Sequence, residues 1–209
     1  MRRILGASAV FAMLALGMAG GVANAAGDSE GTEAAPLASS TVVVNEVSTR
    51  GLNGNLDEFI ELRNVSNQPQ DVSGYTIRIY SPSNVVTDTI VLPAGTILQP
   101  KGNAGQYAVL VGQNFSGTIV DQTYVIPFTL ASVEGIPTLG GLALQNMSGA
   151  KIDGVAFSNA VVTPREGNAA IPENALTDQL NAANTRNILS TDTDNNRQDF
   201  SLQLRTPGL

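Results

Sequence analysis

An acidic segment near the end of the chain carries the side chains best suited to binding a metal ion. Asp192, Asp194 and Asn196 stand at alternate positions, and Asp199 follows. Oxygen ligands at alternate positions are typical of calcium loops, and extracellular calcium is abundant enough to fill weak sites. The spacing departs from an EF-hand, because Arg197 stands where that loop requires glycine. We therefore predict a calcium site at these four residues, with a turn capped by the same side chains as the alternative.

A second set of carboxylates lies in the first half of the chain and could in principle perform acid–base chemistry. Hydrolysis of glycosides needs two carboxyl groups at a fixed separation, normally with aromatic platforms for the sugar. The chain has no Trp and only 5% aromatic residues, so the composition disfavours a glycosidase. On neighbouring strands these acids would repel one another, with Arg63 or Arg78 as a plausible partner. The set comprises Glu46, Asp57, Glu58 and Glu61.

The 209 residues include no His and no Cys, which removes several classes of site. Serine–histidine triads, cysteine nucleophiles, disulfides and the usual zinc, haem and iron–sulfur ligand sets all need one of these residues. The only lysines are Lys101, in a turn, and Lys151, at the start of a strand, and neither context favours a catalytic amine. We predict no catalytic residues and no cofactor other than calcium. The formal charge of −7 also makes nucleic acid an unlikely partner.

The first 25 residues have the features of a secretory signal peptide. Arg2 and Arg3 precede an apolar run of about 15 residues, and small residues occupy positions 23 and 25. The run is shorter than the roughly 20 residues that span a bilayer, so we expect cleavage rather than a transmembrane anchor. Residues 26–40 are small and polar, which is typical of a flexible leader. The predicted location is extracellular or at the cell surface, with one domain over residues 41–209.

From residue 41 the chain alternates short β-like runs with turn residues. Runs rich in Val, Ile and Thr recur every 10 to 15 residues or so, and Gly, Asn and Pro separate them. This pattern favours an all-β fold, an antiparallel sandwich or barrel, because parallel strands would need long crossovers. The predicted strands cover residues 41–48, 58–63, 75–80, 85–92, 106–111, 118–126, 141–145, 151–157 and 199–204.

Residues 159–190 interrupt this pattern with a long stretch poor in β-forming residues. Pro172 could open a short helix over 173–182, in which Leu176 and Leu180 would share a face. A loop excursion of this length is either a functional loop or a surface insertion. Since nothing in the core pattern requires it, we expect it to provide the specific binding surface.

The chain resembles the lamin tail domain family in several blocks that occur in the family's order. Val44-Asn45-Glu46-Val47 and residues 57–64 resemble its opening. Residues 71–75, 92–96 and 100–102 match the next blocks, and residues 191–208 match the closing segment of bacterial members. The resemblance implies an immunoglobulin-like antiparallel β-sandwich and a bacterial, secreted protein. It carries over no catalytic residue. Gly74 and Gly95 of these blocks are expected where the chain needs a positive φ or lacks room for a Cβ.

These features together favour a secreted, non-catalytic binding or adhesion module, with a protein or cell-envelope ligand. Binding would use loops at one end of the sandwich or an exposed sheet edge. One alternative is an extracellular metal-dependent hydrolase, a nuclease or phosphoesterase working through Asp and Glu, or an accessory domain to one. Another is a self-assembling surface protein built through strand edges. We expect a monomer or weak oligomer, with no membrane span after signal cleavage.

Overall fold

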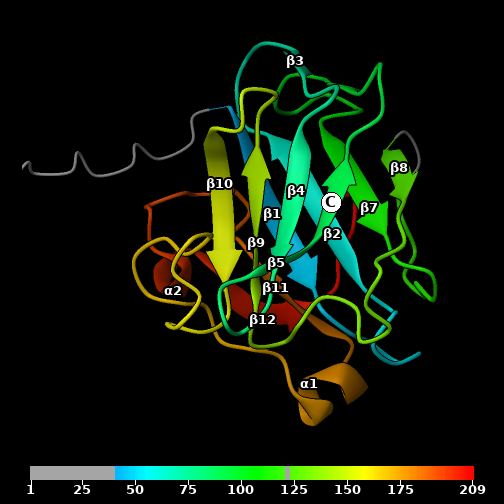
Figure 1. The fold of residues 1–209 in the computed structure, drawn as a ribbon. Helices are drawn as coiled ribbons and strands as arrows, with labels where there is room; N and C mark the ends of the chain where they lie inside the picture. Colours follow the sequence, from blue (N-terminus) through cyan, green and yellow to red (C-terminus); the bar gives the residue numbers. More distant parts are fainter. Residues whose placement is uncertain (1–40, 121–122) are drawn as a thin grey trace, which may run out of the picture. The chain divides into compact units, whose positions relative to one another are not determined.

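The computed structural model describes residues 41–120 and 123–209, so the predicted signal peptide and leader lie outside the described residues. These residues form two packed sheets and a small two-stranded one, with two short helices (Figure 1). The strands are β1 (Val42–Ser48), β2 (Phe59–Asn64), β3 (Gln70–Asp71), β4 (Thr76–Tyr80), β5 (Val86–Val91), β6 (Ile97–Leu98), β7 (Tyr107–Val111), β8 (Tyr124–Pro127), β9 (Gly141–Gln145), β10 (Lys151–Ala156), β11 (Ala182–Thr185) and β12 (Ser201–Leu204). The helices are α1 (Ala175–Gln179) and α2 (Asn196–Asp199).

The two main sheets confirm the predicted immunoglobulin-like β-sandwich. The larger has the order β12-β11-β1-β2-β7-β8, the smaller β10-β9-β4-β5, and β3 pairs with β6. Alternate side chains on each strand point to opposite faces of a sheet. In β2, for example, Ile60 and Leu62 enter the central core, while Phe59 and Glu61 lie on the other face. The core draws on strands of both sheets, including Val44, Leu110 and Leu144.

One strand pairing differs from the antiparallel pattern that the sequence predicts. Strand β8 runs parallel to β7, with Val109 opposite Val125, and it begins at Tyr124 rather than near residue 118. Parallel strands need a connection that returns the chain to the same end of the sheet. The connection from β7 to β8 is long enough for this, whereas a hairpin turn is too short. Phe115 and Ile119 of this connection pack over Phe59 on the outer face of the larger sheet.

The excursion over residues 159–190 contains more regular structure than the sequence suggests. Helix α1 lies within the predicted range but is shorter, because the Asn174 side chain caps its first turn and Asn181 adopts a positive φ of 53°. Leu176 and Leu180 remain 63% and 58% exposed. Strand β11 was not predicted, since Ala-Ala-Asn-Thr has little β propensity; its pairing with β1 and β12 stabilises it.

Local turn chemistry follows the sequence closely. Gly74 and Gly95 have φ values of 72° and 83°, as expected for positions that favour glycine. The Asp71 carboxylate accepts a hydrogen bond from the Ser73 amide at 2.9 Å, and the Ser73 hydroxyl accepts one from the Gly95 amide at 2.9 Å.

Neither described helix has the length or the apolar character that crossing a bilayer would require.

Candidate functional site

The most unusual side chain of the interior is Arg186, which is fully buried at the end of β11. Its Nε donates to the Val44 carbonyl at 2.9 Å, and its Nη2 lies 3.0 and 3.1 Å from the two oxygens of Asp153. Its Nη1 lies 3.0 Å from Asp199 Oδ2, and the guanidinium stands 4.5 Å from the centre of the Phe200 ring. A buried arginine with this many partners organises the segments around it.

A β-bulge in β1 lies beside Arg186. The register between β1 and β2 shifts between Val44 and Glu46, and the Arg186 amide donates to the Asn45 carbonyl at 2.9 Å. Bulges bend a strand and redirect its side chains. The backbone at Arg186 therefore lies against the bulge of β1. Its guanidinium extends from there to the Val44 carbonyl of β1 and to Asp153 of β10.

Asp153 on β10 receives this guanidinium and links the two sheets. Its Oδ2 accepts from the Val44 amide of β1 at 2.7 Å, and its Oδ1 from the Gly154 amide at 2.7 Å. Burial disfavours a charged guanidinium, but the carboxylates of Asp153, Asp192 and Asp199 outweigh it and hold the pKa of Arg186 above its usual value. The sequence signal for Asp153 is a carboxylate within a predicted strand whose other residues, after Lys151 at its start, are apolar or glycine.

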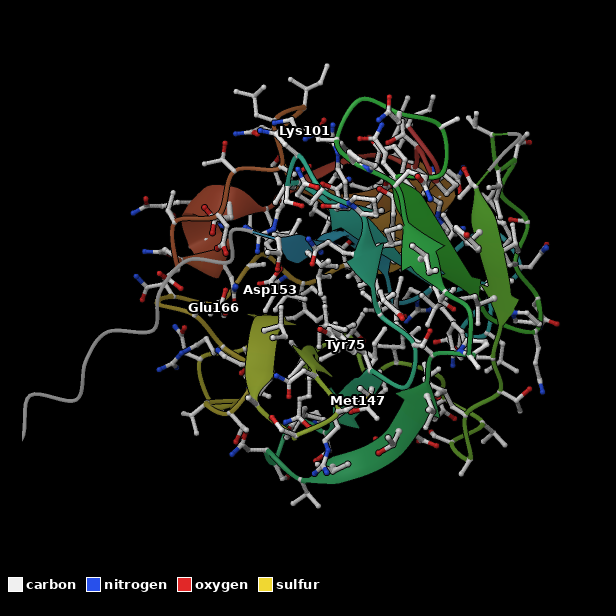
Figure 2. All side chains as sticks on the ribbon, turned by 90° about the horizontal axis from the view of Figure 1, so that it is seen from above. Tyr75, Lys101, Met147, Asp153 and Glu166 are labelled. Atoms are coloured by element: carbon white, nitrogen blue, oxygen red, sulfur yellow. The ribbon has the colours of Figure 1, made fainter. Side chains whose placement is uncertain are left out.

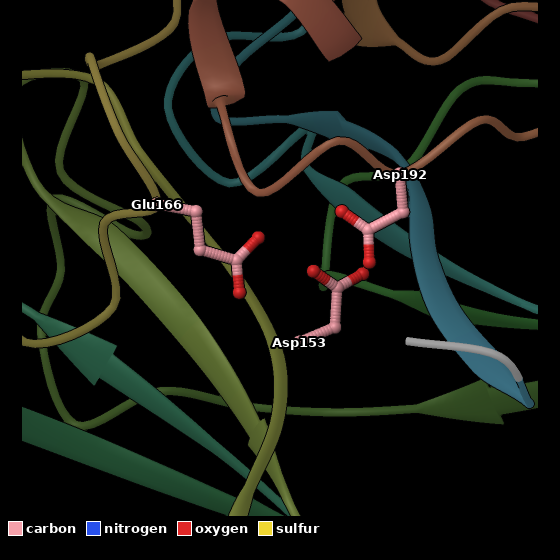
Figure 3. A group of neighbouring side chains, drawn as sticks. All are labelled: Asp153, Glu166 and Asp192. Atoms are coloured by element: carbon pink, nitrogen blue, oxygen red, sulfur yellow. The ribbon is translucent and has the colours of Figure 1, made fainter. Parts of the chain in front are cut away.

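Glu166, from the excursion, completes the cluster beside Asp153. Figure 2 shows Asp153 and Glu166 close together near β10, and Figure 3 shows their carboxylates facing that of Asp192. One oxygen of each of the three residues lies within 4.8 Å of the others. Glu166 Oε1 stands 3.1 Å from Lys151 Nζ. Burial, followed by the nearby charge of Asp153, raises the pKa of Glu166 to about 8.

Of the four predicted calcium ligands, the structure brings only Asp192 into this group. The Asn196 amide is engaged elsewhere: its oxygen accepts from the amides of Ala156 and Glu166, both at 3.1 Å, and its nitrogen donates to the Gly154 carbonyl at 2.8 Å. Asp199 accepts from the Thr193 hydroxyl at 2.6 Å and pairs with Arg186. Asp194 occupies a turn, with a φ of 55°. These contacts match the capped turn named as the alternative, and calcium binding at the four residues stays a prediction.

The second set of carboxylates is divided among three places. Glu46 and Glu61 are directly opposite partners on β1 and β2. Asp57 instead pairs with Arg205 at 2.9 Å and accepts from the Ser116 hydroxyl at 2.6 Å. Glu58 accepts from the Ile136 amide at 2.6 Å, and burial raises its pKa to about 7. This dispersal does not resemble the facing pair of a glycosidase.

Residues 205–209 cross the outer face of the larger sheet and cover the glutamate pair; we call them the C-terminal strap. Thr206 donates to both Glu46 oxygens at 2.9 Å, and the Gly208 amide donates to Glu61 Oε2 at 2.5 Å. Arg205 contacts the Ser48 hydroxyl and the Arg50 carbonyl. The strap and the Asn45 side chain, which donates to Glu61 Oε1 at 2.6 Å, supply hydrogen bonds to the two glutamates. Arg63 and Arg78 were the expected partners, and of these the charge of Arg63 favours the ionised form of Glu61.

The loop after β11 presents two large aliphatic side chains to solvent. Ile188 is 88% exposed and Leu189 is 62% exposed. From below, Arg63 Nη1 donates to the Ile188 carbonyl at 2.9 Å and to the Ser190 hydroxyl at 2.7 Å. The Asn187 side chain accepts from the Leu189 amide at 3.0 Å. We call residues 187–190 the apolar tip; a pocket of about 230 Å³ that includes Ile188 in its lining adjoins it.

Comparison with known proteins agrees with the resemblance seen in the sequence. A family model described as Lamin Tail Domain matches residues 35–202, most of the chain. No curated protein matches it.

Proposed function

Because the chain belongs to the lamin tail domain family, we propose that it is a secreted, non-catalytic module that binds a protein or another ligand of the cell surface. An immunoglobulin-like sandwich is a rigid scaffold whose loops are free to vary, and binding residues are disproportionately found on such loops. The signal-peptide pattern of residues 1–25 supports export. The acidic composition favours a protein ligand over nucleic acid.

The observation that carries the proposal is the apolar tip. Ile188 and Leu189 are adjacent, large and exposed, and they lie in the loop that follows β11. Contiguous apolar patches rimmed by polar residues mark sites of protein–protein contact, and an adjacent apolar pair can form the centre of one. The tip is also held in place by Arg63 and by the Asn187 side chain, so ordering it on binding costs little entropy.

The rest of the excursion is tied to the sandwich, which supports its use as a fixed surface. Glu173 accepts hydrogen bonds from the Thr49 amide at 3.1 and 3.2 Å and from its hydroxyl at 3.2 Å. The Glu166 carbonyl accepts from the Asn196 amide at 2.9 Å. These contacts anchor the first half of the excursion, and β11 anchors the second half by pairing with β1 and β12.

The polar clusters support a scaffold role over a catalytic one. Arg186 and Arg205 each bond backbone carbonyls as well as carboxylates of distant segments. Glu46 and Glu61 are covered by the C-terminal strap. Side chains used in this way stabilise the fold, whereas a catalytic carboxylate must reach substrate in a cleft.

The experiment compares the wild-type protein with a variant carrying Ile188→Ser and Leu189→Ser. Each is immobilised and exposed to cell-surface extract, and the protein that it retains is identified. That partner is then purified, and its binding to the wild type and to the variant is measured. We expect purified partner to bind wild type and to bind the double variant at least about tenfold more weakly, as for loss of a central apolar contact. Val133→Ser, at a side chain that is 80% exposed elsewhere, is the matched control and should bind as wild type. Equal binding by both variants would place the surface away from the tip.

Two further measurements test the alternative functions. Cleavage of DNA or a model phosphodiester with added Mg²⁺ or Ca²⁺, abolished by Glu58→Ala or Asp192→Ala, would replace the binding role with hydrolysis. Light scattering that shows large assemblies of the purified protein would instead favour self-assembly. We expect neither cleavage nor assemblies.

A further inference from the structure

The cluster around Arg186 holds more negative than positive charge. Arg186 interacts electrostatically with four carboxylates, those of Asp153, Asp192, Asp199 and Glu166. A fifth carboxylate, Asp194, interacts with Asp192, Asp199 and Lys151. Two basic side chains, Arg186 and Lys151, therefore face five acidic ones in a largely buried region. Buried charges of one sign need compensation by protons or by a cation.

One carboxylate oxygen in this cluster has no polar partner. The Glu166 side chain is only 3% exposed, and its Oε1 pairs with Lys151. Its Oε2 is buried and makes no hydrogen bond among the residues that the structure describes. Buried polar atoms are rarely left in this state, and a bound ion or water is one of the usual reasons. Figure 3 shows this carboxylate directed at those of Asp153 and Asp192.

The spacing of the three carboxylates suits one metal ion. Their nearest oxygens all lie within 4.8 Å of one another. Calcium–oxygen distances are about 2.3–2.6 Å, so two ligands on opposite sides of an ion are separated by about that span. The chain has no His or Cys, and oxygen ligands select hard cations. Three carboxylates favour Ca²⁺ over Mg²⁺, because Mg²⁺ usually keeps several of its water ligands and binds only one or two carboxylates.

We propose that Asp153, Glu166 and Asp192 bind a divalent cation, with calcium the preferred ion. This site differs from the calcium loop predicted from the sequence, with which it shares only Asp192. It joins β10, the first half of the excursion and the segment before α2, three parts of the chain that are distant in sequence. A bound ion would hold the excursion against the sandwich, independently of what the apolar tip recognises.

Two basic side chains compete with this ion: Arg186, which is fully buried and pairs with Asp153 and Asp192, and Lys151, which pairs with Glu166 and can move. Its ammonium lies 3.1 Å from Glu166 Oε1, and its side chain is 26% exposed, so it can turn towards solvent when the ion enters. Removing this positive charge with Lys151→Met should therefore strengthen cation binding. A lysine that only paired with Glu166 would, on removal, lower stability without changing the response to calcium.

The test is a titration of the purified, EDTA-treated protein with CaCl₂, followed by calorimetry and by thermal melting, with MgCl₂ and MnCl₂ as parallel arms. We expect calcium to bind with a Kd of about 10⁻⁴–10⁻³ M, as in other extracellular modules. At ten times that concentration the melting temperature should rise by about 3–6 °C. Glu166→Gln should weaken binding at least about tenfold, and Lys151→Met should tighten it several-fold.

Two controls separate this site from its alternatives. Glu134→Gln removes an exposed carboxylate that bonds the Asn55 amide and should leave the response unchanged. Asp194→Asn removes a ligand of the sequence-predicted loop only; a lost response here with Glu166→Gln unaffected would assign the ion to that loop. Absence of a response to all three cations in wild type, or an unchanged affinity in Lys151→Met, would overturn the proposal. The Lys151→Met arm decides the matter even if Glu166→Gln fails to fold.

Discussion

Glu46 and Glu61 lie directly opposite each other on β1 and β2, and the C-terminal strap bonds both. Like charges at opposite positions in a sheet repel. Burial raises the pKa of both carboxyls, that of Glu61 to about 8, although the hydrogen bonds from the strap act in the other direction. The pair and the strap therefore form one unit whose stability depends on proton uptake.

This unit should make folding stability fall as the pH rises from about 4.5 to about 8. In that range the unfolded chain ionises Glu61 while the folded protein keeps its proton, so the folded state binds more protons and loses stability with rising pH. The charges facing Glu61 are Glu46 and Arg63, with Tyr107 nearby. Glu61→Gln should reduce the loss of unfolding free energy over this pH range by up to about 5 kcal/mol, since one pKa unit corresponds to about 1.4 kcal/mol. Urea unfolding of both proteins across this range measures the difference, and parallel profiles would contradict it.

Arg205→Ala should destabilise the protein by about 3–5 kcal/mol, because it leaves Asp57 buried without its cation. Burial opposes ionisation of Asp57, but hydrogen bonds from Ser116, Asn53 and Arg205 outweigh it and lower its pKa. A lowered pKa stabilises the fold above the unfolded value and is lost as the pH falls, so the deficit of the variant should shrink in acid. Denaturant unfolding at neutral and acid pH measures this. Arg197→Ala, at an exposed position, serves as control and should change stability by less than about 0.5 kcal/mol.

Asn174→Ala should cost about 1 kcal/mol by removing the cap of α1. The Asn174 oxygen accepts from the Leu176 amide at 2.9 Å and from the Thr177 amide at 3.3 Å. Asn174→Asp keeps an acceptor in the same place and should retain most of the stability. Thermal melting of the two variants compares them directly. Equal losses would mean that the hydrogen bonds to the cap contribute little.

Gly154→Ala should destabilise the protein by about 1–3 kcal/mol, because a Cβ on this residue would overlap the carbonyl oxygen of Pro164. The excursion packs against β10 at this point, so the variant should also become more sensitive to proteolysis within 159–174. Gly149→Ala is the comparison, since a Cβ there meets nothing within 4 Å and only its φ of 82° is strained. Limited proteolysis measures this sensitivity. If Gly154→Ala and the wild type are cleaved at the same rate, the contact does not hold the excursion against β10.

The sequence predicted local features well and long-range ones poorly. Eight of the nine predicted strands lie close to their observed positions, and the short helix in the excursion is present. Strand β8 was placed too early. Strands β3, β6 and β11 were not predicted, the first two because they have only two residues each and β11 because its residues have low β propensity. In the candidate site, only Asp192 was selected in advance. Asp153 is a single carboxylate within a predicted strand, and Arg186 lies in the excursion, where no local pattern marks it for burial.

What the sequence by itself determined were the strand periodicity, the turns at positions such as Gly74 and Gly95, and family membership. These depend on a few neighbouring residues, whose conformational preferences act wherever the segment lies. Only the tertiary structure decided that Glu46 faces Glu61, that the strap covers them, and that Asp153 and Glu166 meet Asp192 beside Arg186. These residues are far apart along the chain. Their meeting depends on which strands pair and how the sheets pack, a balance of burial and desolvation over the whole domain that no local pattern records.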